Sequence, residues 1–182
     1  MLSTDIRPTL LSFCSKTMGF PYRFWMETDP LIGDEGPLWV SHAPRPSLQR
    51  IKHDGVNCAG LINLVRRELH LPLPLLEEGL WYAGGTGAYF EYFEPVLKPY
   101  DPDRDYPTGT LLVKDYVCAE NQGHLAMVWD HTHIVHSWTE TPYSEHVRGQ
   151  LIPNGVQLTP ISWIKQHMHP CHVCFPNDWL SN

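Results

Sequence analysis

The 182-residue chain has few charged residues and no concentration of positive charge. Asp, Glu, Lys and Arg make up 18% of the chain, which is below the roughly 25% of ordinary globular proteins. The 13 Lys and Arg are outnumbered by 20 Asp and Glu, and the net charge of -7 argues against a nucleic-acid-binding protein. Hydrophobic residues reach 42%, which excludes disordered, collagen-like and coiled-coil proteins.

Long apolar stretches and a secretory leader are also missing. No segment approaches the roughly 20 consecutive apolar residues that a membrane-spanning helix needs. The first residues show no basic segment followed by an apolar core and a small-residue cleavage site, so we expect no signal peptide. The sequence therefore predicts a protein without a membrane span. It would be cytoplasmic, released by lysis or carried in a virus particle.

Histidine and cysteine, in contrast, are well represented, with 11 His and 5 Cys. Five cysteines cannot all pair within one chain, and in a reducing compartment we expect free thiols, of which at least one is reactive. Histidine changes its charge near neutral pH, and a cysteine thiolate is a nucleophile. These two residue types are therefore the first candidates for chemistry.

The chain shows no internal repeat and no low-complexity linker, so we expect a single domain over residues 1–182. Helical patterns come first and strand patterns second, which predicts an α+β fold with N-terminal helices packed on a central antiparallel sheet. The expected helices cover residues 4–18, 58–70 and parts of 75–93, after an irregular stretch over 21–46. The expected strands cover residues 110–117, 124–129, 133–138 and 172–175.

Cys58 lies at the start of the clearest helix. Asn57 is a good N-cap, which places Cys58 in the first helical turn. The positive end of the helix dipole stabilises a thiolate there, and the first-turn N–H groups can receive an oxyanion. Farther along the helix, Leu61 and Val65 belong to the apolar face, whereas Arg66 is expected to point elsewhere. The alternative is that Cys58 is a buried core cysteine, the more common role of an unpaired cysteine.

A thiolate nucleophile needs a base, and the base needs a partner that orients it. His124 and His136 lie on two strands that are predicted to form a hairpin. With a three-residue loop over 130–132 both histidines share one face of the sheet, whereas a two-residue loop would put them on opposite faces. The alternative is that both are polar surface residues in a histidine-rich chain.

This order of cysteine, histidine and a second histidine twelve residues later resembles the NlpC family of papain-like cysteine peptidases. The family's nucleophile motif Asp-Cys-Ser-Gly-Leu is similar to Asn-Cys-Ala-Gly-Leu at residues 57–61. Its hairpin, His-Val-Gly-Ile-Tyr followed by Phe-Ile-His-Ala, is similar to His-Leu-Ala-Met-Val at 124–128 and Ile-Val-His-Ser at 134–137. Residues 107–113 and 19–25 resemble the family's Pro-Gly-Asp-Leu-Val and Pro-Tyr-x-Trp-Gly-Gly blocks.

The resemblance implies a papain-like fold with a Cys-His-His site. Cys58 would be the nucleophile, His124 the general base and acid, and His136 the residue that orients His124. Substrate or the oxyanion would be bound by Tyr22, Asn57 and Ala59. The implied function is a cysteine peptidase or amidase that hydrolyses an amide bond without metal or cofactor, in a peptide or a peptidoglycan-like substrate.

Two other functions remain open at this point. In the first, the domain is a catalytically silent member of the fold that binds peptide or serves as a structural or virion protein. In the second, it is an acyltransferase. The C-terminal segment 167–174 holds three histidines and a Cys-x-x-Cys pair, from which a zinc site could be drawn. Structural zinc usually joins two separated ligand pairs, so we favour a closing strand and expect no metal.

Overall fold

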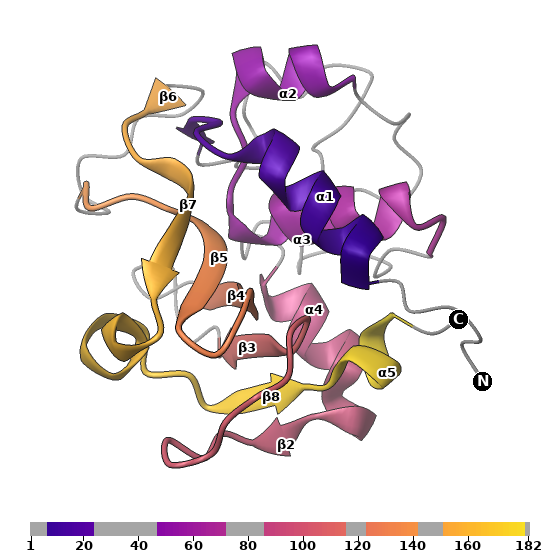
Figure 1. Ribbon diagram of the computed structural model, residues 1–182, viewed down its shortest axis with the longest axis vertical. Helices are drawn as coiled ribbons and strands as arrows, with labels where there is room; N and C mark the ends of the chain where they lie inside the picture. Colours follow the sequence, from indigo (N-terminus) through magenta and orange to yellow (C-terminus); the bar gives the residue numbers. More distant parts are fainter. Residues whose placement is uncertain (1–6, 24–46, 72–85, 116–122, 142–150, 181–182) are drawn as a thin grey trace.

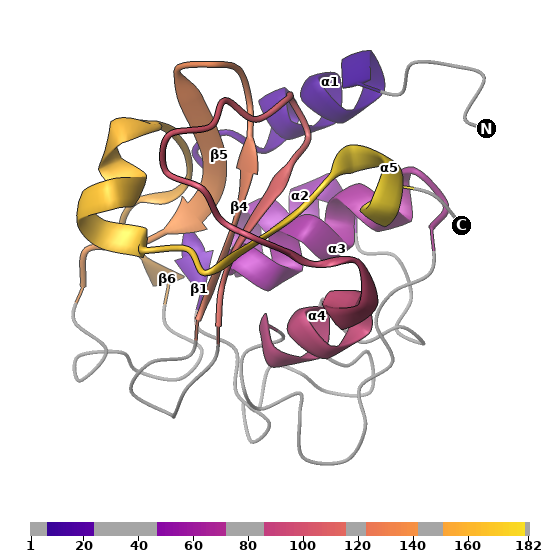
Figure 2. The same cartoon turned by 90° about the horizontal axis from the view of Figure 1, so that it is seen from below.

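The computed structural model of the chain describes residues 7–23, 47–71, 86–115, 123–141 and 151–180. An antiparallel sheet forms its centre, and helices pack on one face of that sheet (Figures 1 and 2). This confirms the α+β prediction. Most of the irregular stretch predicted over 21–46 lies outside the described residues, as does Cys118.

The helices are α1 (Arg7–Thr17), α2 (Leu48–Asp54), α3 (Cys58–Glu68), α4 (Thr86–Phe93) and the short α5 (Pro176–Trp179). Helices α1 and α3 confirm two of the predicted helices, and α4 is one of the short helices expected within 75–93. Helix α2 was not predicted. It begins at Ser47, whose side chain accepts a hydrogen bond of 3.1 Å from the Arg50 backbone N–H and so caps the helix.

The main sheet has six strands in the order β2-β8-β3-β4-β5-β7, and every neighbouring pair is antiparallel. Its strands are β2 (Lys98–Pro99), β3 (Leu111–Lys114), β4 (His124–Val128), β5 (His133–Trp138), β7 (Gly155–Pro160) and β8 (His172–Cys174). A separate pair joins β1 (Tyr22–Arg23) to β6 (Leu151–Ile152). Strands β3, β4, β5 and β8 confirm the four predicted strands, whereas β7 was not predicted.

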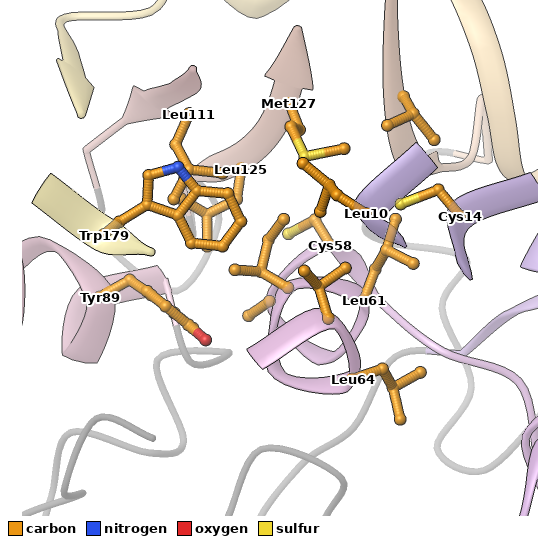
Figure 3. Close-up of a cluster of buried hydrophobic side chains, with 14 of the residues drawn as sticks. Leu10, Cys14, Cys58, Leu61, Leu64, Tyr89, Leu111, Leu125, Met127 and Trp179 are labelled. Carbon is orange, nitrogen blue, oxygen red and sulfur yellow. The ribbon is translucent and has the colours of Figure 1, made fainter. Parts of the chain in front are cut away.

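Both faces of the sheet are covered. Leu125 and Met127 of β4 belong to the larger hydrophobic core, which α1, α3 and α4 complete (Figure 3). Ala126 and Val128 point to the opposite face and pack in a smaller core that includes Ile164, at the start of the helical turn η5 (Ile164–Met168). In Figure 2 this golden turn and α3 lie on opposite sides of the strands. Side chains on β4 are therefore buried whichever way they point.

Arg66 corrects one expectation of the sequence analysis, because its side chain does not point to solvent. Only 1% of it is exposed, and its guanidinium donates a hydrogen bond to the Trp179 backbone carbonyl. Its guanidinium carbon lies 5.6 Å and 5.4 Å from the ring centroids of Tyr92 and Phe93. A backbone acceptor and two aromatic rings thus replace water around a buried cation.

Gly155, at the start of β7, fixes the position of the segment that leads into β1. Its φ is +76°, and a Cβ at this position would lie 1.9 Å from the Phe20 carbonyl oxygen. The next residue, Val156, exchanges two backbone hydrogen bonds of 2.8 Å with Phe20 and Gly19. Only glycine allows the two backbones to approach this closely.

Replacing this glycine tests the close approach. We expect Gly155→Ala to lower the free energy of unfolding by more than about 3 kcal/mol, because backbone atoms must move apart. Gly19→Ala is the matched control, since Gly19 also has a positive φ, +78°, but no atom lies within 4 Å of its added Cβ. The control variant should lose only about 1 kcal/mol, which is the cost of placing an alanine at a positive φ. Equal losses in urea unfolding of the two variants would contradict this interpretation.

Candidate active site

The start of α3 places Cys58 in the first helical turn. The Asn57 side-chain oxygen accepts a hydrogen bond of 2.8 Å from the Gly60 N–H, which confirms Asn57 as the N-cap. The first regular helical bond runs from the Leu61 N–H to the Asn57 carbonyl, 3.0 Å. The first-turn N–H groups, including that of Ala59, therefore point out of the positive end of the helix.

The residues just before Cys58 are tied to two other segments. The Val56 N–H donates to the Pro21 carbonyl at 2.9 Å, and the Val56 carbonyl accepts a bond of 2.6 Å from the Ser137 hydroxyl. Arg23 donates through Nη1 to the Asp54 carbonyl at 2.7 Å. The start of α3, strand β1 and the end of β5 are thereby joined.

Tyr22 lies close enough to Cys58 for the two side chains to interact electrostatically. Desolvation raises the pKa of the Tyr22 phenol, and the negative charge of a Cys58 thiolate raises it further. Tyr22 pairs with Ile152 of β6, and its neighbour Pro21 accepts the Val56 N–H two residues before Cys58. The role of Tyr22 in binding substrate or the oxyanion stays a prediction.

The side chain of Cys58 is largely enclosed. It is 8% exposed and belongs to the larger hydrophobic core. In Figure 3 its sulfur lies among Leu10, Leu61 and Met127. This environment is the one that the buried-cysteine alternative predicts.

The β4–β5 hairpin has the register that the sequence analysis required. Met127 pairs with Val135 and Val128 pairs with Ile134, which leaves a three-residue loop over 130–132. The Asp130 carboxylate closes this loop by accepting the backbone N–H groups of residues 132 and 133 at 2.7 and 2.8 Å. The prediction that both histidines share one face of the sheet is therefore confirmed.

His124 and His136 are joined directly. His124 Nε2 lies 2.9 Å from His136 Nδ1, and His136 Nε2 lies 2.9 Å from the Thr159 hydroxyl oxygen. The two histidines are 3% and 0% exposed, so the surface-residue alternative is wrong for both. Thr159, on the unpredicted strand β7, is the residue of this group that the sequence analysis missed.

Two tryptophans enclose the histidine pair. The Trp138 ring meets the His124 ring edge to face, with centroids 4.9 Å apart, and is stacked on the His136 ring at 6.0 Å. The Trp163 ring meets both the His136 ring and the Trp138 ring edge to face, each with centroids 5.1 Å apart. These rings take the place of water around the two imidazoles.

Burial keeps both imidazoles neutral. It lowers the pKa of His136 to about 3, and it is also the main cause that holds the pKa of His124 well below its usual value. The neighbouring His136 and the Lys114 ammonium lower the pKa of His124 further. Two neutral rings joined by one hydrogen bond must have one donor nitrogen and one acceptor nitrogen at the contact.

Cys58 and His124 lie at the same end of the sheet, although they belong to different cores. Ser137, which binds the Val56 carbonyl two residues before Cys58, lies next to His136 on β5. Continued from Met127 and Val135, the register places Ser137 opposite Leu125, beside His124. His124 is the first residue of β4, so its ring lies at the strand end near which α3 begins.

Two residues of the C-terminal histidine and cysteine segment, His172 and Cys174, have structural contacts. His172 lies 3.2 Å from the Asp115 carboxylate, and its ring meets Phe90 edge to face. Cys174 is buried, which raises the pKa of its thiol to about 12, whereas Cys171 is exposed. Among the described residues, three or more His, Cys, Asp or Glu side chains nowhere gather as a metal site would require.

Comparison with models of known protein families gives no match, and comparison with curated proteins gives none. Within the described ranges, every helix is too short or too polar to cross a membrane. The functional interpretation therefore depends on the geometry of the site.

The cap at Asn57 yields a stability prediction. Asn57→Ala should lower the free energy of unfolding by about 1 kcal/mol, because the Gly60 N–H loses its acceptor. Asn57→Ser keeps a side-chain oxygen at this position and should recover most of the loss. Urea unfolding of the three proteins at neutral pH measures both values, and equal losses in the Ala and Ser variants would contradict the capping role.

The neutral histidines predict a loss of stability in mild acid. Unfolding returns both groups to an ordinary pKa near 6.5, so the unfolded chain binds more protons than the folded one below that pH. The free energy of unfolding therefore has its full value above about pH 6.5. It decreases as the pH drops below 6.5 toward the pKa values of the folded state. His136, with a folded pKa of about 3, should contribute a loss of about 2 kcal/mol between pH 7 and pH 5, and His124 should add a further loss in the same direction. Urea unfolding at the two pH values measures the sum.

His136→Gln separates this effect from the titration of other groups. The variant should be less stable at pH 7 but should lose about 2 kcal/mol less than the wild-type protein between pH 7 and pH 5. His131→Gln, in the exposed hairpin loop, is the control and should keep the full dependence. If His136→Gln retained the wild-type pH dependence, His136 would not be the buried neutral group described above.

Proposed function

We propose that the protein is a cysteine hydrolase, a peptidase or amidase with a papain-like arrangement of Cys58, His124 and His136. One observation carries the proposal. Two buried histidines are hydrogen-bonded to each other at the end of the sheet where a helix begins with a cysteine in its first turn. Nucleophilic catalysis by a thiol requires these three parts, namely a nucleophile, a base and a group that orients the base.

The contacts of His124 assign roles to its two nitrogens. Because Nε2 is hydrogen-bonded to His136, Nδ1 is the nitrogen that would take the thiol proton. The bond to His136 fixes the orientation of the ring and stabilises the imidazolium that forms when Nδ1 is protonated. His136 thereby acts as the orienting residue of the site.

The proposed reaction proceeds in two halves. His124 Nδ1 takes the thiol proton as the Cys58 sulfur attacks the carbonyl carbon of an amide, and the first-turn N–H groups of α3 receive the resulting oxyanion. His124 returns the proton to the amine as the carbon–nitrogen bond breaks, which leaves a thioester on Cys58. Water, deprotonated by His124, then attacks the thioester, releases the acid and restores the thiol.

Tyr22, Asn57 and Ala59 complete the proposed site. Tyr22 contributes a neutral phenol within electrostatic range of Cys58, and this phenol donates to the substrate carbonyl or to the oxyanion. Asn57 fixes the helix start, and Ala59, whose side chain is buried in the larger core, contributes its first-turn N–H group. The proposed substrate is a peptide or a peptidoglycan-like peptide, since the site groups are neutral and suit an uncharged amide.

Thiol labelling tests the proposal. Iodoacetamide at pH 6 should modify Cys58 faster than Cys14 and Cys174, because burial raises the pKa of each of these two thiols to about 12. Modification of Cys58 should also outpace that of the exposed Cys171. The adducts are mapped by mass spectrometry of peptides at successive times. His124→Ala should slow the modification of Cys58 by about 100-fold or more.

His131→Ala is the control variant and should leave the labelling rates unchanged. On peptidoglycan stem peptides, the wild-type protein should release new amino groups and Cys58→Ser should release none. Modification of all the cysteines at one slow rate, independent of His124, would overturn the proposed activity.

The second candidate is a catalytically silent domain of the same fold that binds a peptide or has a structural role. The observation in its favour is the enclosure of Cys58, which is only 8% exposed within the hydrophobic core. This candidate predicts that Cys58 is labelled no faster in the native protein than Cys14. The same labelling experiment therefore distinguishes the two functions.

A further inference from the structure

Thr159 connects the histidine pair to strand β7. Its backbone pairs with Ile134 of β5, and its hydroxyl oxygen lies 2.9 Å from His136 Nε2. Its side chain shares the face of the sheet on which both histidines lie, and the residue is only 8% exposed. Three side chains from three neighbouring strands thus form one continuous row of hydrogen-bonding groups from His124 to Thr159.

The hydrogen bonds of this row can run in only two directions while both rings are neutral. In the first, His124 Nε2–H donates to His136 Nδ1 and His136 Nε2–H donates to the Thr159 hydroxyl oxygen. In the second, the Thr159 hydroxyl donates to His136, His136 Nδ1–H donates to His124, and the remaining His124 proton sits on Nδ1. Only the first direction leaves His124 Nδ1 without a proton.

Protonation of His124 removes the second direction altogether. Both nitrogens of an imidazolium are donors, so His136 Nδ1 must accept and the only proton of His136 must sit on Nε2. That N–H is buried and requires an acceptor, because orphaned buried N–H groups are rare and costly. The Thr159 hydroxyl oxygen is the group at hydrogen-bond distance from it.

We infer that Thr159 is a positioning residue, which holds both histidines in their Nε2–H tautomers and so keeps His124 Nδ1 available as a base. This inference rests on the proposed function for the role of Nδ1, whereas the tautomers can be measured independently of any activity. Valine at position 159 would leave His136 Nε2–H without an acceptor. The proton would move to Nδ1, where His124 Nε2 can accept it, and His124 would then carry its own proton on Nδ1.

Nitrogen-15 NMR of the histidine rings tests this assignment directly at neutral pH. In the wild-type protein both His124 and His136 should show a protonated Nε2 and an unprotonated Nδ1. Thr159→Val should move the proton to Nδ1 in both rings, and Thr159→Ser should preserve the wild-type tautomers because it keeps the hydroxyl. Thr110→Val is the matched control. It removes another buried hydroxyl, one that donates to the Pro107 carbonyl at 2.8 Å, and should leave both rings unchanged.

Labelling of Cys58 supplies the functional readout. Thr159→Val should slow alkylation of Cys58 by on the order of 100-fold, because the base is lost, and Thr159→Ser should retain the wild-type rate within a few-fold. Unchanged tautomers in Thr159→Val, or a serine variant as slow as the valine variant, would overturn the role of Thr159.

The wild-type spectrum decides even if Thr159→Val fails to fold, since a proton on His124 Nδ1 in the native protein would itself refute the inference. Nε2–H tautomers that depend on Thr159, found together with an unreactive Cys58, would instead overturn the proposed hydrolase. They would leave the assignment of Thr159 intact, so the two failures are distinguishable.

Discussion

The burial of helix α3 on all sides is the constraint on which the rest of the structure depends. Its residues from Cys58 to Arg66 are buried, with the sheet on one side and α1 and α4 on others. A helix so enclosed cannot rotate or slide without opening the core, so its first turn has a fixed place at the end of β4 and β5. Polar side chains on it need internal partners, which Asn63 finds in the Tyr89 hydroxyl and Arg66 finds in the Trp179 carbonyl. Packing that serves stability therefore also determines where the thiol and the first-turn N–H groups lie.

The burial of helix α3 stabilises the fold, whereas the burial of the histidine pair lowers the stability of the folded protein. Two imidazoles without solvent must satisfy four ring nitrogens internally, and the contacts to each other and to Thr159 account for three of them. The fourth, His124 Nδ1, is the nitrogen assigned to chemistry. Buried titratable groups with strongly shifted pKa values are typical of functional sites. Two apolar residues in these positions would fill the smaller core without the loss of stability in acid.

Local patterns predicted the parts of the site that depend on local interactions, and missed those that depend on distant ones. The cap at Asn57 and the three-residue hairpin loop are set by neighbouring residues, and both are confirmed. Strand β7 was missed because its pattern is ambiguous, with Leu158 exposed and Thr159 buried. The contact of Thr159 with His136 spans 23 residues, and nothing in the sequence near either residue indicates it.

The burial of Arg66 is equally non-local, since its partners come from α4 and α5. Hydrophobic periodicity also could not predict that Cys58 and His124 belong to two different cores. It assigns a residue to one face of its own element but does not place two elements relative to each other.

A neutral third residue has a consequence for how the thiol can be activated. A carboxylate beside His124 would attract the imidazolium electrostatically and favour a thiolate–imidazolium pair before substrate binds. His136 has no charge, and burial lowers the pKa of His124 itself, so the uncharged thiol and imidazole are the favoured resting state. The proton then moves to His124 only as the sulfur attacks an electrophile, and in the amide reaction the negative charge passes to the oxyanion at the helix start. In such a site the hydrogen-bond direction of the histidine row matters more than the charge of its members. Thr159, at the far end of the row, sets that direction. It therefore matters to the chemistry even though it touches neither the thiol nor the substrate.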